Sequence, residues 1–518
     1  MPTPDPPSET TRTLPLLRLD HLWAILALSL IAGFISMAPT SPNDFWWHLR
    51  VGQIIATEGL PTTNMFAWGV PPETPFTYQS WLGQWLFFQL YQLGGLPLIV
   101  FTRNLLGAMT FALVVWEAQQ RSGSWRLAAL AVLLAAAMSI NNFIIRTQNW
   151  SWLPFMLTLI ILGSYTRQRL GPRWLVVLPV IMALWVNLHG AFVLGLLVAG
   201  AFVVGETLRR WLRDPYALPW YRLRPLYLAA LAMLLATLLN PLGPGIFGYV
   251  GTILGSNQIQ NLIIEWQPPR QSDLAGAAFY AGVLALLAAF GIGRRRPTLT
   301  DLLLVCGLLW QAFGGSRSVV WFGMAAMPIL AQSLGTAKLA GDATPSLSRR
   351  ERGAGTAANL AVVILLALGV IALQPWFKPY LPLPVEYQAL FAPVPGAPQS
   401  FTTTTPVAAV AHLLAEPCSG QIFNEMGYGS YMAWALYPQA RHFIDTRIEL
   451  FPWERWQEYI AVTEGRDLAE FLDANQVGCV VLDQPLQPGL AAAMPDLSGW
   501  RQSFSDGRSE VWRRSITP

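Results

Sequence analysis

Long apolar runs constrain the fold of this chain more than any other feature. The 518 residues contain about eleven runs that are long and apolar enough to cross a bilayer as helices. Only 12% of the residues are charged, whereas a soluble domain has about 25%. The sequence therefore predicts an α-helical polytopic membrane protein. The runs cover residues 21–38, 96–118, 125–143, 150–166, 174–187, 191–208, 225–239, 274–292, 299–313, 319–334 and 360–373.

The placement of arginine predicts the orientation of these helices. Basic residues gather in alternate loops, and the positive-inside rule assigns those loops to the cytoplasm. The opposite loops hold only Arg50, Arg146, Arg270 and Arg317. This pattern predicts a multi-pass protein with a cytoplasmic N-terminus and an extracytoplasmic C-terminus. Because the arginines lie in short loops between apolar runs, we expect no nucleic-acid partner.

Composition divides the chain into four parts. Residues 1–20 are rich in Pro, Thr and Ser, which predicts a disordered cytoplasmic N-terminus. Residues 21–374 form the transmembrane part, with a large first outer loop at 39–95 and no cleavage site after the first run. Residues 375–400 are a Pro-rich connector. Residues 401–518 have the composition of a globular domain.

Alternating patterns in residues 401–518 predict a small extracytoplasmic α/β domain. Helices are expected at 406–415, 428–436 and 467–475, and strands at 420–424, 442–445 and 479–483. A hairpin is expected at 500–513, around Asp506 and Gly507. Cys418 and Cys479 lie in this domain and can form a disulfide on the outer side. With Cys306 they show no metal-binding spacing.

The stretch 42–66 carries unusual chemistry directly after the first apolar run. On a helix Asp44, Trp47 and His48 fall at i, i+3 and i+4, so they share one face. Trp46 and Trp47 are expected at the level of the lipid headgroups. A buried acid and histidine cost free energy unless they are used or paired. The alternative is an interfacial helix in which Asp44 is only the N-terminal cap.

Further polar residues stand at the outer ends of the predicted spans. Individually they have structural explanations, since His189 can satisfy a tight hairpin and arginines can snorkel. Together they combine groups that bind phosphate with carboxylates that take a proton. This is what moving a sugar from a polyprenyl-phosphate carrier to an acceptor requires. The residues are Asp44, His48, Arg146, His189, Glu265, Trp266 and Arg317.

Several motifs extend this pattern over nearly the whole chain after residue 20. They are NDFWWHLRVGQ, LWVNLHGAFVLG, LLNPLG with IIEW, SRSVVWFGMAAMP, and NEMGYGSYMAW with FIDTRIELFP. With the long first outer loop, the chain resembles the type C integral-membrane glycosyltransferases, and more narrowly a group of bacterial multi-spanning proteins. The resemblance implies the bacterial cell membrane as location and Asp44 as catalytic base. The usual acidic pair is missing, because Asn43 and Phe45 flank Asp44, and only Glu265 can supply a later acid.

A second group of polar residues lies at predicted strand ends in the C-terminal domain, where loops of α/β layers carry function. The group can be a salt-bridged domain interface. We expect the face that bears Asp445 and Arg447 to pack toward the membrane cavity. The residues are Asn424, Glu425, Asp445, Arg447 and Glu449.

The sequence leaves three functions open. In a glycosyltransferase, Asp44 is the base, Arg146 and Arg317 hold the carrier phosphate, and His48, His189 and Glu265 position the donor or a divalent metal. The sugar, the acceptor and the metal requirement stay open. A non-catalytic scaffold or lipid-binding protein would use the C-terminal domain as its partner surface. A transporter would use polar residues within the spans, for which Arg103 and Gln311 are the candidates.

Overall fold

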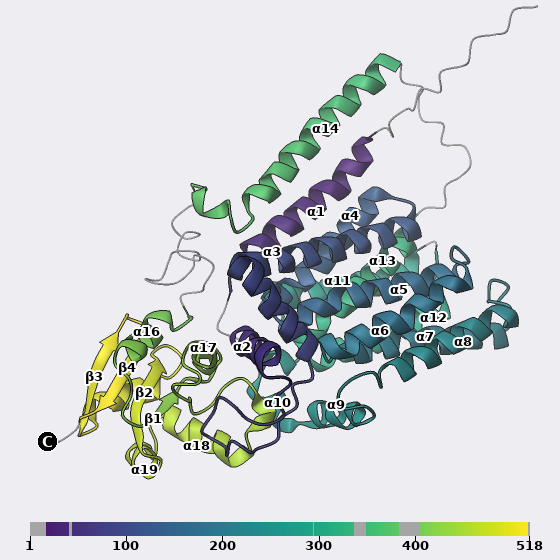
Figure 1. The fold of residues 1–518 in the computed structure, drawn as a ribbon. Helices are drawn as coiled ribbons and strands as arrows, with labels where there is room; N and C mark the ends of the chain where they lie inside the picture. The colour runs from purple at the N-terminus through teal and green to yellow at the C-terminus, as the bar shows by residue number, and fades with distance from the viewer. Residues whose placement is uncertain (1–16, 41–43, 294, 336–348, 383–403, 516–518) are drawn as a thin grey trace, which may run out of the picture.

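The computed structural model describes residues 17–40, 44–293, 295–335, 349–382 and 404–515. It has a helical part, which ends near residue 382, and a C-terminal α/β region at residues 404–515 (Figure 1). Most of the predicted disordered N-terminus and most of the predicted connector lie outside the described residues.

The helical part follows the predicted apolar runs. Four of its described helices are long and apolar enough to cross a membrane, namely α1, α3, α7 and α11. The apolar stretches of the other described helices are shorter, so the predicted number of eleven spans is not established. The helices are α1 (Leu19–Met37), α3 (Trp81–Ser122), α4 (Trp125–Met138), α5 (Trp152–Thr166), α6 (Val177–Leu188), α7 (Phe192–Trp211), α8 (Trp220–Ala236), α11 (Leu274–Ile292), α12 (Leu299–Gly314), α13 (Val319–Leu334) and α14 (Arg349–Ala372).

The first loop contains α2 (Phe45–Thr57), which packs against the first half of α3. A kink at Gly94 and Gly95 separates this half of α3 from the half that begins the second apolar run. The two helices cross closely at Gly52, where a Cβ would lie 2.1 Å from the carbonyl oxygen of Gln84. A glycine is needed at this crossing because any side chain would force α2 away from α3.

The prediction that Trp46 and Trp47 lie at headgroup level is wrong. Their side chains are buried, because the C-terminal region covers them. Trp46 packs edge-on against Tyr431, and Trp47 donates a 3.1 Å hydrogen bond from Nε1 to Thr446 Oγ1. The amphipathic face of α2 therefore meets protein rather than lipid headgroups.

Two helices lie between the predicted runs 225–239 and 274–292, where the sequence predicts no helix: α9 (Gly245–Gly255) and α10 (Asn257–Leu262). The sequence does not predict these helices because glycines, which are typical of loops, stand at 245, 248, 251 and 255. In Figure 1, α9 lies at the lower end of the helical part and α10 lies beside the C-terminal region. Both helices border the cavity described below.

The C-terminal region is built on a four-stranded sheet in the order β1-β2-β4-β3. Strand β1 runs parallel to β2, and the pairs β2–β4 and β3–β4 are antiparallel. Every residue of β2 is buried, as expected for a central strand. The strands are β1 (Gln421–Asn424), β2 (Val477–Asp483), β3 (Trp500–Ser505) and β4 (Ser509–Arg514), and the helices are α16 (Val407–Ala415), α17 (Met426–Ala435), α18 (Trp453–Thr463), α19 (Leu468–Ala474) and α20 (Pro488–Ala493).

Most of the elements expected here are present, including the hairpin β3–β4 and the disulfide between Cys418 and Cys479. The sequence analysis predicted neither α18 nor α20. The strand expected at 442–445 is wrong, because His442 forms only isolated bridges, to Ala67 and to Ile422. Instead of pairing within the sheet, residues 442 and 443 hydrogen-bond to the backbone of the first loop.

The first loop is joined to the C-terminal region by backbone hydrogen bonds. Trp68 N donates to His442 O at 2.8 Å, and Gly69 N donates to Phe443 O at 3.1 Å. His442 N in turn donates to Phe66 O at 3.2 Å. Because these bonds involve backbone on both sides, they fix the C-terminal region against the loop that carries Asp44.

Candidate functional site

A cavity of about 620 Å³ lies where the helical part, the first loop and the C-terminal region meet. Apolar side chains of α7 and α9, such as Leu194 and Ile253, form part of its wall. Its polar lining comes from segments that are far apart in the sequence. Seven residues from the two predicted groups line the cavity: Asp44, His48, His189, Trp266, Arg317, Arg447 and Glu449.

Asp44 stands immediately before α2, but its side chain makes no capping hydrogen bond with any described residue. Its backbone is helical (φ −52°, ψ −23°), whereas a capping residue is typically extended. The carboxyl group therefore does not turn back onto the first amides of α2. Asp44 lines the cavity instead, which speaks against the interpretation of this residue as only a cap.

His48 follows one turn later on the same face and is held by α3. The side-chain amide of Gln84 donates a 2.9 Å hydrogen bond to Nδ1, which assigns the ring proton to Nε2. Burial lowers the pKa of His48 to about 3, and the nearby charge of Arg146 adds to this effect. His48 is consequently a neutral group in the cavity wall at physiological pH.

His189 serves both the turn between α6 and α7 and the cavity. Its Nδ1 lies 3.1 Å from Ala191 N, which donates to it, and 3.2 Å from Ser151 Oγ. Trp185 Nε1 donates to the same Ser151 oxygen at 2.8 Å. The hairpin explanation for His189 therefore holds, and the ring still lines the cavity.

Arg146 and Glu265 form an ion pair with each other. Neither is among the residues that line the cavity, although the charges of Arg146 and Asp44 act on each other. Glu265, the expected second acid, is thus bound to Arg146.

The guanidinium of Arg317 stacks over the ring of Trp266, the residue next to Glu265, at 4.6 Å from the ring centroid. Arg317 faces the cavity and has no carboxylate within ion-pair distance among the described residues.

The C-terminal region contributes a buried ionic cluster around Asp445. Arg447 Nη2 and His442 Nε2 both lie 2.7 Å from Asp445 Oδ2. Burial alone would favour the protonated acid, but the Arg447 charge and the two hydrogen-bonded partners hold the pKa of Asp445 below its ordinary value. Arg447 also reaches the first loop, with Nη1 3.3 Å from the Tyr78 hydroxyl. The cluster is therefore a salt-bridged interface that forms part of the cavity wall.

Asn424 and Glu425 do not line the cavity. Asn424 is fully buried and binds the backbone of Phe443 and Ile444 on the adjacent segment. Glu425 caps α17 by accepting a 2.9 Å hydrogen bond from Tyr428 N. Both residues therefore stabilise the fold. The sequence grouped them with Arg447 at predicted strand ends, although only Arg447 of these three lines the cavity.

Glu449, from the second predicted group, is a carboxylate that lines the cavity. It lies in the short helix η7 (Ile448–Leu450), and its side chain is open to the cavity although protein atoms surround it. Burial raises its pKa to about 7, and the charge of Asp44 adds to the rise. Tyr249 of α9 also interacts with Glu449. The sequence analysis did not identify Tyr249, because this residue lies in a glycine-rich stretch.

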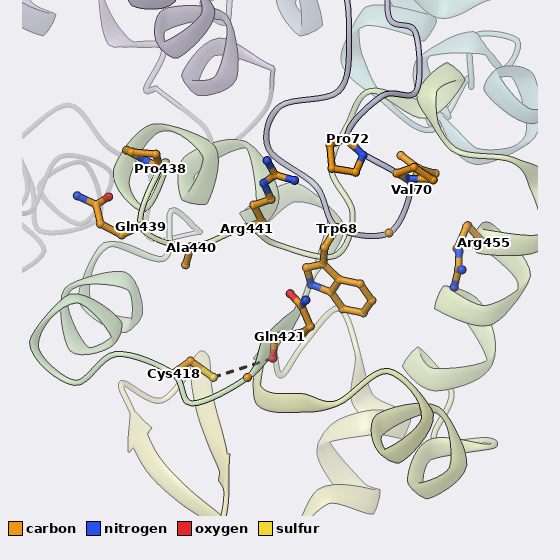
Figure 2. A pocket seen from close by; sticks show the side chains of 13 residues that line it. Trp68, Val70, Pro72, Cys418, Gln421, Pro438, Gln439, Ala440, Arg441 and Arg455 are labelled. Carbon is orange, nitrogen blue, oxygen red and sulfur yellow. Dashed lines mark hydrogen bonds between the residues drawn. The ribbon is translucent and has the colours of Figure 1, made fainter.

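A metal site is not evident in the described part of the chain, where no three His, Cys, Asp or Glu residues are grouped as ligands. A second pocket, of about 690 Å³, lies between the first loop and the C-terminal region. Figure 2 shows Trp68, Arg441 and Arg455 around it. It is slightly larger, but no acid or histidine lines it and no predicted site residue reaches it. The chemistry is therefore concentrated in the first cavity.

No protein-family model matches the chain, and no curated protein matches its sequence. Its structure is similar to ArnT from Cupriavidus metallidurans bound to undecaprenyl phosphate, with 17% identity and a TM-score of 0.51. That match covers 96% of this chain and 98% of ArnT. It is also similar to the arabinofuranosyltransferase AftD from Mycobacteria, with 15% identity and a TM-score of 0.50, over 98% of this chain and 41% of AftD. The chain therefore shares its overall fold with ArnT and AftD.

Proposed function

We propose that this chain is a membrane glycosyltransferase that moves a sugar from a polyprenyl-phosphate carrier to an acceptor on the outer face of the bacterial cell membrane. The observation that carries the proposal is the cavity in which Arg317 and Asp44 face the same space. A guanidinium without a carboxylate partner suits a phosphate. A carboxylate that is not used as a cap suits proton transfer.

The proposed reaction assigns a role to each part of the cavity. The acceptor oxygen forms a bond to the anomeric carbon, and the bond from that carbon to the carrier phosphate breaks with its electron pair left on the phosphate. Asp44 takes the acceptor proton. Arg317 binds the phosphate, and Trp266 holds Arg317 in place by stacking. Arg146, paired with Glu265, sets the charge around Asp44.

The remaining lining residues support a lipid-linked donor. Neutral His48 and His189 offer hydrogen bonds to a sugar without adding charge, and the apolar side chains of α7 and α9 suit a lipid tail. The similarity of the fold to ArnT bound to undecaprenyl phosphate favours the same class of carrier. The disulfide between Cys418 and Cys479 favours an oxidising compartment for the C-terminal region.

The alternatives are less well supported. A scaffold does not need an open cavity lined by a carboxylate and a guanidinium. A transporter would need polar groups available within the helices. Of the two candidates, Gln311 of α12 lines the same cavity as Asp44. Arg103 is occupied by Asn104 and by the carbonyl oxygens of Ala38 and Phe143. Arg103 is thus fixed between helices and has a structural role.

Asp44→Asn tests the proposed base. The substitution keeps the size of the side chain but removes the proton acceptor, so transfer should fall by about a hundred- to ten-thousand-fold. Purified protein is incubated with sugar-linked polyprenyl phosphates from the expressing cells, and their consumption is followed by mass spectrometry. Because the Asp44 side chain does not cap α2, expression should hardly change. Transfer at the wild-type rate would show that Asp44 is not the base.

A further inference from the structure

The first turn of α3 joins the end of α6 to α2 at one side of the cavity. Trp81 Nε1 donates a 2.7 Å hydrogen bond to Asn187 Oδ1. At Gly83, a Cβ would lie 2.8 Å from the carbonyl oxygen of Leu188, so the two backbones approach without room for a side chain. Since α2 crosses α3 one residue later, at Gln84, a single turn of α3 contacts both elements.

Two histidines on these elements present N–H groups to the cavity. His189 Nδ1 accepts a 3.1 Å hydrogen bond from Ala191 N, so its ring proton lies on Nε2. His48 has the same tautomer, because the Gln84 amide donates to its Nδ1. The His48 ring also packs on the Trp47 ring, with the two centroids 3.7 Å apart, which fixes its orientation. Neither Nε2 atom has a hydrogen-bond partner among the described residues, so both N–H groups are left for a ligand.

Gln84 adds an unpaired acceptor to these two donors. Its side chain is 1% exposed and lines the cavity. Its Nε2 atom is used by His48, but its buried Oε1 atom accepts no hydrogen bond from any residue that the structure describes. A buried acceptor without a donor costs free energy. A ligand hydroxyl that donates to Oε1 would remove this cost.

The other polar residues on this side of the cavity are also uncharged. They are Gln79 and Ser80, just before α3, and Thr147 and Gln148 of η2 (Thr147–Ser151). Arg146, which precedes η2, is bound to Glu265 and does not line the cavity. Of the charged lining residues, only Asp44 stands next to one of these elements, and the proposed reaction assigns it to the acceptor.

We propose that His48, Gln84 and His189 form a sugar subsite, which binds the sugar of the lipid-linked donor, and that this sugar is uncharged. The inference rests on the proposed function and names its substrate class. Two N–H donors and one carbonyl acceptor match hydroxyl groups, which both donate and accept hydrogen bonds. An ammonium or carboxylate group on the sugar would lose its hydration here and gain only neutral partners.

Native mass spectrometry in detergent tests the sugar subsite without turnover, because no acceptor is supplied. Full-length protein is titrated with undecaprenyl phosphate, bare or linked to a sugar. The neutral sugars are glucose, galactose, mannose and arabinose, and the charged analogues are glucuronic acid and glucosamine. The sugar gain is the affinity for the linked lipid divided by that for the bare lipid. In the wild type it should reach about 10-fold for at least one neutral sugar and be absent for both charged analogues.

Variants then test the residues of the subsite. Gln84→Leu removes the acceptor and should reduce the sugar gain by about 3- to 10-fold, the scale of one neutral hydrogen bond. His189→Phe removes one donor and should act in the same way. Gln92→Leu is the matched control, because Gln92 is an exposed glutamine of α3 that does not line the cavity. Binding of the bare lipid shows that each variant is folded, since an unfolded protein binds neither lipid. An unchanged sugar gain in Gln84→Leu and His189→Phe would overturn the subsite.

The outcomes separate this inference from the proposed function. A charged analogue that binds more tightly than every neutral sugar would overturn the uncharged substrate and leave the lipid carrier intact. Wild-type protein that binds the bare lipid but gains affinity from no neutral sugar would overturn the sugar subsite alone. If the wild type binds no polyprenyl phosphate in any form, the proposed function fails and the inference fails with it.

Discussion

At the scale of single residues, His48 shows how the fold sets the chemistry of the cavity. The ring is only 7% exposed, is held by Gln84 and lies near the Arg146 charge. These surroundings keep it neutral, although a histidine in water titrates near pH 6.5. A neutral ring can bind a sugar hydroxyl without repelling Arg317 or attracting the acid that takes the proton.

The depressed pKa of His48 predicts a loss of stability in acid. Between pH 6.5 and about 3, the unfolded chain binds a proton at His48 that the folded protein does not bind. Stability from this group therefore falls as the pH falls below 6.5. The melting temperature in detergent should drop more between pH 7 and pH 5 for the wild type than for His48→Gln. His412→Gln, which changes a histidine whose side chain is 18% exposed, is the control. Its melting temperature should drop between pH 7 and pH 5 as much as that of the wild type. Equal drops in wild type and His48→Gln would contradict the account.

Single residues also show which parts of the site could be predicted from the sequence. Asp44, His48 and Arg317 could be found because they are polar groups at the ends of apolar runs. The pairing of Arg146 with Glu265 could not, because it joins loops 119 residues apart. Glu449 was a candidate in the C-terminal group, but its local pattern does not show that it lines the same cavity as Asp44.

At the scale of elements, the crossing of α2 and α3 positions the face that carries Asp44 and His48. The helices touch at Gly52, where their backbones approach so closely that no side chain fits. The helices and strands with strong periodicity were predicted well from sequence, including β2 and the hairpin. Helix α9 was not, because its glycines are typical of a loop. The strand predicted at 442–445 was wrong, because only His442 forms isolated bridges there.

Gly52→Ala should therefore disturb the site without touching a polar group. The new Cβ would lie 2.1 Å from the Gln84 carbonyl oxygen, so α2 must move and take His48 with it. Overpacking of this kind costs about 1–3 kcal/mol. Gly200→Ala is the control, since this glycine of α7 has open space around it. We expect a lower melting temperature and slower transfer for Gly52→Ala only. Equal behaviour of the two variants would show that the crossing does not position α2.

At the scale of the whole molecule, the cavity exists only because three parts of the chain meet. The helical part supplies Arg317 and the apolar wall, the first loop supplies Asp44, and the C-terminal region supplies Arg447 and Glu449. Backbone bonds between the first loop and residues 442–443 hold them together. The apolar helices and the α/β region could be predicted from the sequence, but the closure of the cavity by the C-terminal region depends on long-range contacts that no local pattern encodes.

The binding of a polyprenyl phosphate in this cavity is the central claim, and native mass spectrometry in detergent tests it most directly. Wild-type protein titrated with undecaprenyl phosphate should bind one lipid. Arg317→Ala should weaken binding by about 10- to 100-fold, the scale of a charged hydrogen bond. Arg270→Ala, at an exposed arginine that does not line the cavity, should bind like the wild type. Equal affinity of wild type and Arg317→Ala, or no bound lipid in either, would contradict the account.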